Sequence, residues 1–262
     1  MKLITILTDF GTKNGYVAQM KGVISSITDA IIIDVSHDIS SHNILEGAFV
    51  LRNSISYFPT GTVHIAVIDP GVGTDRKCIF ITTEKQILIG PDNGLLIPAA
   101  RLIGNFQVYE ITNEKYMLSN FSNTFHGRDV FAPVAAHILN GVKFSDIGKK
   151  INDFIDLKFD YAIKKEKEII GKIVYIDNFG NLITNIDKDN ILSVFDFNTK
   201  INFLIKNKSI TIPFVKSYGF VKKDQLLTTI GSNNFLEISQ NNGNASNKLK
   251  LKLNDEIKLR IN

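Results

Sequence analysis

The stretch that decides the fold is Val63-His64-Ile65-Ala66-Val67-Ile68-Asp69-Pro70-Gly71-Val72-Gly73-Thr74-Asp75-Arg76. Its first half is an apolar run that predicts a buried strand, and its second half is a polar, glycine-containing loop. Glycine lets the backbone turn sharply and lets a ligand approach closely. Functional side chains commonly lie on such loops, which rigid strands hold in place. The stretch therefore predicts a central strand with a candidate site at its carboxyl end.

The segments around this strand alternate between strand and helix patterns. Residues 2–8 and 30–35 are short apolar runs, whereas residues 16–27 and 43–57 carry apolar side chains at helical spacing. The order strand, helix, strand, helix, strand is typical of an α/β domain with a mostly parallel sheet. Further strands are predicted at 78–83 and 86–89, and further helices at 95–103 and 129–139.

The chain after residue 163 follows a different pattern. Residues 164–168, Lys-Lys-Glu-Lys-Glu, form a charged run that we interpret as a linker between an α/β domain, 1–163, and a second domain, 169–262. The second domain has short β-rich runs that Asn- and Gly-containing turns separate, and no convincing helical pattern. This predicts an all-β, barrel-like domain. The runs are 169–176, 201–205, 209–212, 225–230, 235–239 and 256–261.

Charge distribution, the lengths of the apolar runs and the cysteine content indicate which partners and which location to expect. The net charge is +4, and the lysines are scattered rather than gathered in a stripe with stacking aromatic residues, so no nucleic-acid partner is expected. The N-terminal apolar run is too short for a signal peptide, and no run reaches the length of a membrane span. We therefore expect a cytoplasmic protein without a membrane partner. The single cysteine, Cys78, lies in an apolar run and is interpreted as a small buried hydrophobic residue.

Charged side chains that follow predicted strands form the candidate site. Asp9 follows the first strand, and ligands of open α/β sheets bind at the carboxyl ends of the strands. A carboxylate there can accept two hydrogen bonds from a ribose diol. Asp69, Arg76 and His126 together can hold and polarise a water molecule, with acid–base groups taking its proton. Each of them also has an ordinary structural alternative: a turn cap, a surface ion pair or a hydrogen-bonded loop residue.

Several common sites are absent from the sequence. There is no G-x-G-x-x-G dinucleotide motif, no P-loop and no G-x-S-x-G nucleophile turn. Residues 36–42, Ser-His-Asp-Ile-Ser-Ser-His, contain metal-ligand types, but their spacing matches no standard zinc pattern, so no metal is expected. Polar loop residues recur at 176–185 in the second half. This predicts a site between domains, where pockets often form.

Six spaced motifs resemble those of one family, the S-adenosyl-L-methionine (SAM) hydroxide adenosyltransferases, which are adenosine-forming SAM hydrolases related to fluorinase and chlorinase. The resemblance covers nearly the whole chain and keeps the order of the motifs. Gly243-Asn244-Ala245 near the end fits as well. The motifs are Leu7-Thr8-Asp9-Phe10-Gly11, Ile33-Asp34-Val35-Ser36-His37, Asp69-Pro70-Gly71-Val72-Gly73, Gly90-Pro91-Asp92-Asn93-Gly94, Phe125-His126-Gly127-Arg128-Asp129 and Asp177-Asn178-Phe179-Gly180-Asn181.

The resemblance implies a fold, an assembly and roles for residues. The fold is an N-terminal α/β domain with a C-terminal β-barrel, and the assembly is a homotrimer with sites between subunits. In that family an Asp, Arg, His set holds the attacking water, and it matches Asp69, Arg76 and His126, while Asp9 matches the ribose-binding acid. Contacts to the adenine and to the methionine end are implied for Asp177, Phe179, Asn181, Ser232 and Glu237.

The implied reaction is hydrolysis of SAM to adenosine and L-methionine by attack of water or hydroxide on the 5′ carbon. SAM is the substrate, and no cofactor or metal is expected, because the leaving group departs as a neutral thioether. Halogenases of the family lack the Asp-Arg-His set and carry an extra loop. No such insertion is visible here, which favours the hydrolytic branch. A halide-dependent adenosyltransferase and a non-catalytic adenosine- or SAM-binding protein remain alternatives.

Overall fold

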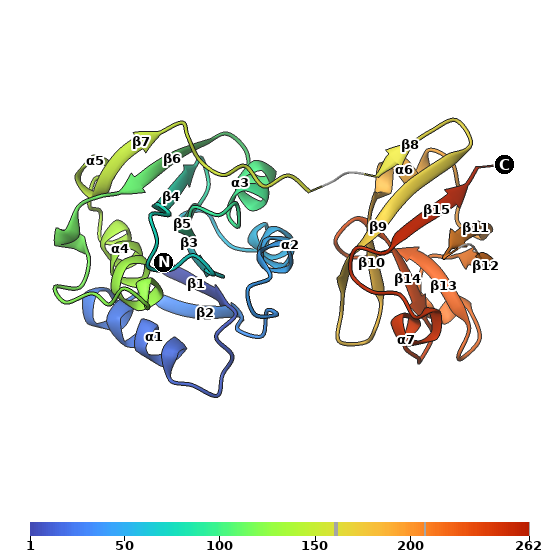
Figure 1. The fold of residues 1–262 in the computed structure, drawn as a ribbon, viewed down its shortest axis with the longest axis horizontal. Coiled ribbons are helices and arrows are strands. Elements are labelled where there is room, and N and C mark those ends of the chain that lie inside the picture. The colour runs from blue at the N-terminus through green and yellow to red at the C-terminus, as the bar shows by residue number, and fades with distance from the viewer. Residues whose placement is uncertain (160–161, 207, 262) are drawn as a thin grey trace. The chain divides into compact units, whose positions relative to one another are not determined.

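The computed structural model describes residues 1–159, 162–206 and 208–261. The chain divides into two compact units, Met1–Lys158 and Phe159–Asn262 (Figure 1). Each unit has its own hydrophobic core. We describe the two units separately, as unit 1 and unit 2.

Unit 1 is built on a seven-stranded sheet of order β2-β1-β3-β5-β4-β6-β7. The neighbours β2, β1, β3 and β5 are parallel, and β4, β6 and β7 are added by antiparallel pairing. The predicted α/β domain with a mostly parallel sheet is confirmed. The strands are β1 (Leu3–Thr8), β2 (Ile31–Ser36), β3 (Val63–Val67), β4 (Cys78–Thr83), β5 (Ile87–Pro91), β6 (Phe106–Ile111) and β7 (Gly148–Ile151).

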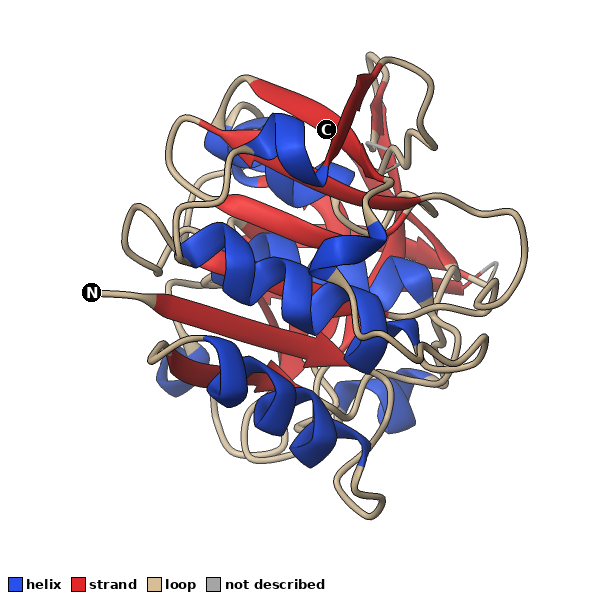
Figure 2. Ribbon diagram, turned by 90° about the vertical axis from the view of Figure 1, so that its left-hand side faces the viewer, coloured by secondary structure: helices blue, strands red, loops and turns tan. Residues whose placement is uncertain are grey.

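Helices cover both faces of this sheet. Figure 1 shows α1 and α4 on one side and α2 and α3 on the other, and Figure 2 shows the strand after the N-terminus, β1, lying among helices. Helix α2 begins where the Asn43 side chain accepts a hydrogen bond from the Glu46 backbone N–H, as favoured helix caps do. The helices are α1 (Tyr16–Ile27), α2 (Ile44–Ile55), α3 (Ile97–Ile103), α4 (Ala132–Leu139) and α5 (Phe144–Ile147), with a 3-10 turn η1 (Glu114–Tyr116) and a π-helical turn η2 (Gly127–Phe131).

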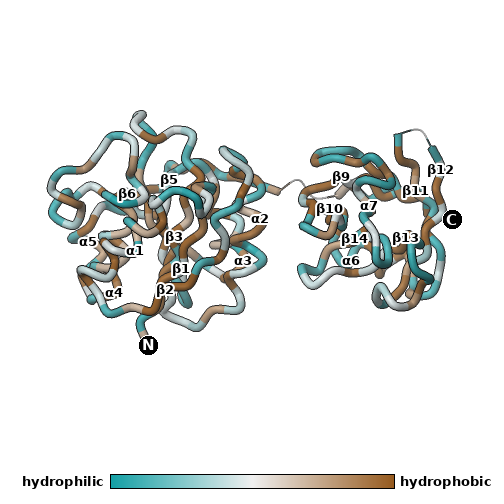
Figure 3. Tube along the Cα trace, turned by 90° about the horizontal axis from the view of Figure 1, so that it is seen from below, coloured by the Kyte–Doolittle hydropathy of each residue, from teal (hydrophilic) through white to brown (hydrophobic). Residues whose placement is uncertain are grey.

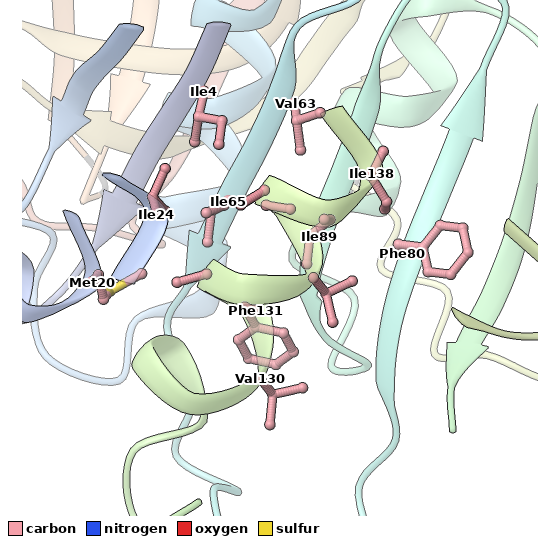
Figure 4. Close-up of a cluster of buried hydrophobic side chains, with 14 of the residues drawn as sticks. Ile4, Met20, Ile24, Val63, Ile65, Phe80, Ile89, Val130, Phe131 and Ile138 are labelled. Atoms are coloured by element: carbon pink, nitrogen blue, oxygen red, sulfur yellow. The ribbon is translucent and has the colours of Figure 1, made fainter. Parts of the chain in front are cut away.

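A core between the sheet and helices α1 and α4 fixes the ends of the central strands. Ile65 of β3, Met20 of α1 and Phe131 of η2 are fully buried in it (Figure 4). Burying one such side chain contributes about 1.5–3 kcal/mol. The central strands are correspondingly the hydrophobic part of the trace in Figure 3, whereas polar residues lie on the loops. The loops that follow β1 and β3 therefore begin at strand ends that the core holds rigid.

Unit 2 is a β-barrel that seven strands close. Its order is β10-β14-β13-β12-β11-β15-β9, and β9 pairs with β10 to complete the ring, while β8 pairs with the first part of β9. The predicted barrel is confirmed. Residues 165–167 join β8 to β9, within the charged run 164–168. The strands are β8 (Ile163–Lys164), β9 (Glu168–Ile176), β10 (Leu182–Asp187), β11 (Thr199–Ile205), β12 (Lys208–Phe214), β13 (Leu226–Ile230), β14 (Phe235–Gln240) and β15 (Glu256–Arg260).

Unit 2 also contains short helices that its sequence pattern did not predict: α6 (Lys188–Leu192), α7 (Ala245–Leu249) and the 3-10 turn η3 (Tyr218–Phe220). Side chains of Asp187 and Asn244 cap α6 and α7. These helices span one or two turns, too short for a hydrophobic period to be visible. In the described parts of both units, no helix combines the length and the apolar character needed to cross a membrane.

Two loops of unit 1 meet at Gly73. This residue has φ +78°, and a Cβ placed on it would lie 2.6 Å from the carbonyl oxygen of Asn123. The loop after β3 therefore packs against the loop that leads into η2, and only glycine fits at the contact.

We predict that Gly73→Ala destabilises unit 1 more than Gly61→Ala does. Gly61 also has a positive φ, +88°, but a Cβ there would meet nothing within 4 Å. Both variants bear the cost of a left-handed alanine, about 1–2 kcal/mol, and only Gly73→Ala adds the clash with Asn123. Urea unfolding of the two variants measures the difference. Equal midpoints would show that the two loops part without cost.

Candidate active site

A pocket of about 270 Å³ lies at the carboxyl ends of β1 and β3. This is the edge of a parallel sheet at which ligands bind. The walls combine charged groups with an aromatic cluster in which Phe10, Tyr16 and Phe125 contact one another edge to face. The aspartate and histidine side chains on its walls are Asp9, His42, Asp69 and His126.

The Asp69 carboxylate and the Arg76 guanidinium form a buried ion pair beside this pocket. Arg76 Nε donates to Asp69 Oδ1 at 3.0 Å and to Oδ2 at 3.1 Å, and Nη2 donates to Oδ2 at 2.5 Å. Only 9% of the Arg76 side chain and 6% of the Asp69 side chain are exposed. Burial works against the charge of Arg76, but the hydrogen bond and charge of Asp69 outweigh it, so the pKa of Arg76 is raised. Arg76 therefore stays protonated.

The His126 ring completes the set. Its Nδ1 lies 2.8 Å from Arg76 Nη2. A guanidinium can only donate, so Nδ1 is the acceptor, and the ring proton of neutral His126 lies on Nε2. Burial and the charge of Arg76 lower the pKa of His126, against the opposing charges of Asp69 and Asp129. The predicted Asp, Arg, His set is therefore one hydrogen-bonded unit with a neutral imidazole.

The π-helical turn η2 holds His126 in place. His126 caps the turn, and π-helical turns are often found at functional sites. A Cβ on Gly127 would lie 3.3 Å from Met20 Sδ, so the turn packs tightly on α1. The fully buried Asp129 accepts hydrogen bonds from the Ser122 backbone at 2.7 Å and from Arg128. The loop before η2 is thereby fixed on both sides of His126.

Asp9 follows β1, the parallel neighbour of β3, and lines the same pocket. Its Oδ2 accepts a hydrogen bond from the His42 backbone N–H at 2.8 Å, and among the described residues no hydrogen bond reaches its Oδ1. The preceding Thr8 is hydrogen-bonded to the buried His37 at 2.8 Å, and His37 Nε2 lies 3.0 Å from Asp34 Oδ1. The Ser36–His42 stretch thus braces the end of β1. Sequence reasoning missed this role.

In unit 2, Asp177 and Asn181 form a closed turn between β9 and β10. Asp177 Oδ1 accepts from the backbone N–H groups of Phe179 and Asn181, both at 2.9 Å, and Asn181 Nδ2 donates to Asp177 Oδ2 at 2.8 Å. The ring of Phe179 is 77% exposed. This turn presents a carboxylate beside an open aromatic face.

Glu237 and Tyr218 form the second polar group of unit 2. The buried Glu237 accepts from the Tyr218 hydroxyl at 2.7 Å and from Ser239 Oγ at 2.6 Å. Burial, the Glu237 carboxylate and the charge of Asp177 raise the pKa of Tyr218, so the hydroxyl keeps its proton. Sequence reasoning missed Tyr218, whose only signal is the turn Ser217-Tyr218-Gly219. Ser232 is exposed on the turn between β13 and β14.

Two further observations concern metals and the cysteine. Within residues 1–159, 162–206 and 208–261, no three His, Cys, Asp or Glu side chains are grouped so that they could hold a metal ion. Cys78, interpreted above as a buried hydrophobic residue, is only partly buried, and Arg76 Nη1 donates to its Sγ at 2.9 Å.

Comparisons with known proteins match the whole chain. A family model described as SAM hydroxide adenosyltransferase N-terminal domain matches residues 4–148, and one described as SAM hydroxide adenosyltransferase C-terminal domain matches residues 171–258. The (R)-S-adenosyl-L-methionine hydrolase of Methanocaldococcus jannaschii is 42% identical over 99% of this chain and 96% of its own length. A fluorinase of Actinopolyspora mzabensis is 27% identical over 73% of each chain. A crystal structure of an uncharacterized conserved protein from Thermotoga maritima has a TM-score of 0.94 and 37% identity, covering 98% of this chain and 99% of that one.

We predict that Arg76→Gln raises the pKa of His126. The substitution removes the positive charge that disfavours protonation of the ring, and it leaves the opposing carboxylates of Asp69 and Asp129 in place. NMR titration of the histidine side chains measures the change. His137, whose pKa burial alone lowers, serves as the control in the same sample. A His126 midpoint that does not move would contradict the electrostatic coupling.

Proposed function

The chain belongs to the SAM hydroxide adenosyltransferase family, and on this premise we propose that it hydrolyses SAM to adenosine and L-methionine. The observation that carries the proposal is the buried Asp69–Arg76–His126 set on the wall of a pocket that also contains Asp9. A protein that only binds SAM has no need of a set that can hold a water molecule.

The reaction needs a positioned nucleophile above all. The water oxygen bonds to the 5′ carbon of SAM while the carbon–sulfur bond breaks. The electron pair of the broken carbon–sulfur bond stays on sulfur and neutralises the sulfonium. Methionine therefore leaves as a neutral thioether, so no general acid, metal or cofactor is required. Holding the water in line with the breaking bond lowers the barrier by several kcal/mol. The demand falls on the groups that hold the water and receive its proton.

We propose different roles for the three groups. Because Arg76 occupies Nδ1 of His126, the ring offers Nε2–H as a donor to the water oxygen. Asp69 is the acceptor for the proton of the water, and the Arg76 charge lowers the cost of forming hydroxide next to that carboxylate. His126 thus orients the water, and Asp69 receives its proton.

The remaining residues bind the substrate in this proposal. Asp9 accepts hydrogen bonds from the ribose diol through the oxygen that His42 leaves free. The exposed ring of Phe179 offers a stacking surface for adenine, and carboxylates of unit 2 attract the methionine ammonium. We also propose a homotrimer with sites between subunits. The contacting residues in unit 2 are Asp177, Phe179, Asn181, Ser232 and Glu237.

A halide-dependent adenosyltransferase is the nearest alternative. The buried carboxylate of Asp69 on the pocket wall argues against it, because a chloride ion beside it would be repelled. The name of the relatives specifies the (R) form of SAM. The two sulfonium epimers of SAM therefore need to be assayed separately.

We predict that the purified protein forms adenosine and L-methionine from SAM in chloride-free buffer, and that Asp69→Ala and His126→Ala each lower turnover at least about tenfold. Liquid chromatography of the products with each epimer, with and without chloride, measures this. His137→Ala is the matched control. Formation of 5′-chloroadenosine would support a halide-dependent adenosyltransferase. Unchanged turnover in both site variants would contradict the catalytic role of Asp69 and His126.

We predict that Asp9→Ala weakens binding of adenosine and SAM at least about tenfold, since a carboxylate that accepts two ribose hydroxyls makes charge-assisted hydrogen bonds. Isothermal titration calorimetry measures the affinities. Asp38→Ala, at an exposed carboxylate in the next strand-end loop, is the control. Equal affinities in wild type and Asp9→Ala would rule out the ribose role.

A further inference from the structure

Cys78 contacts two members of the proposed catalytic set. Its Sγ accepts a hydrogen bond from Arg76 Nη1 at 2.9 Å and lies 3.7 Å from His126 Nδ1. Cys78 begins β4, and its backbone is paired with Pro91 of β5, so its position is set by the sheet rather than by a loop. Arg76 and His126 both come from loops. The thiol is thus a contact between these two loop residues and the rigid strands.

The protonation state of Cys78 decides what it can do there. Burial raises the pKa of the thiol, and the charges of Asp69 and Glu110 add to this effect against the opposing charge of Arg76. A neutral thiol has one weak donor and weak acceptor capacity. Its sulfur accepts from Arg76, and the acceptor within reach of its S–H is Nδ1 of His126.

We propose that Cys78 is a positioning residue, whose thiol holds the Nη1 side of the Arg76 guanidinium and donates to Nδ1 of His126. Two donors, Arg76 Nη2 and the thiol, then converge on Nδ1. Arg76 already holds the ring proton on Nε2, and the thiol, which shares the same Nδ1 lone pair, further restricts the direction of Nε2–H. The role in water activation rests on the proposed function, whereas the effect on the pKa of His126 does not.

The charged and titratable groups that act on the ring set the sign of the pH effect. They are Arg76, Asp69, Asp129 and Cys78. The thiol donates to the neutral ring, so its removal makes the protonated ring relatively more favourable and raises the pKa of His126. Protonation places a hydrogen on Nδ1 and breaks the bond from Arg76 that holds the ring in position. In Cys78→Ala, turnover is therefore lost at a higher pH than in wild type as the pH falls.

The test compares Cys78→Ala with Cys78→Ser. We expect Cys78→Ala to lower kcat about three- to tenfold, which corresponds to one hydrogen bond, with KM within about twofold, and to shift the acid limb of the kcat profile upward. Serine keeps a donor and an acceptor, so Cys78→Ser is expected to restore most of kcat and the wild-type limb. Thr82→Ala, on the same strand, controls for loss of a polar side chain.

A second readout does not require turnover. NMR titration of His126 measures its pKa: we expect a higher pKa in Cys78→Ala than in wild type and Cys78→Ser, while Nε2 carries the proton of the neutral ring in all three. Wild-type protein that fails to hydrolyse SAM contradicts the proposed function but leaves this test intact. A Cys78→Ala variant with wild-type kcat, pH profile and His126 pKa overturns the positioning role, as does a Cys78→Ser variant that behaves like Cys78→Ala.

Discussion

The ion pair between Asp69 and Arg76 is the constraint on which the rest of the site depends. Two ionised groups with less than a tenth of their side chains exposed are costly unless their hydrogen bonds are well made. Here three N–H···O contacts satisfy them, and a further N–H on each of Nη2 and Nη1 is directed at His126 and Cys78. The pair need not increase the stability of the fold. It fixes the places at which its neighbours must lie.

The loops are built to meet that requirement. Asp69 follows β3, Arg76 precedes β4, and the two strands come from opposite directions with β5 between them. The loop that joins them packs on the backbone of Asn123, and the turn after His126 packs on α1. Close contacts at Gly73 and Gly127 therefore determine the distance between the imidazole and the guanidinium. Packing beside the pocket, by residues outside the hydrogen-bonded set, supplies the precision of the site.

Sequence patterns predicted the elements with a strong hydrophobic period and the residues at strand ends. The helix at 16–27 and the strand at 63–68 agree with α1 and β3 to within a residue. β6 and β10 were not predicted. Polar residues interrupt the apolar pattern of β6, and β10 overlaps a motif that was interpreted as a loop. The contacts of Cys78 and Tyr218 could not be predicted, since both depend on which distant residues the fold brings within hydrogen-bond reach.

The depth of the ion pair also determines how the site responds to dissolved salt. Mobile ions screen exposed charges over about 10 Å at 0.1 M, but they screen buried pairs much less. A surface pair such as Lys2–Asp29, with the aspartate side chain 86% exposed, weakens as the ionic strength rises. Asp69 and Arg76 keep their geometry under the same conditions. A rise in ionic strength thus changes the rate at which a charged ligand associates at salt concentrations that leave the geometry of Asp69 and Arg76 unchanged.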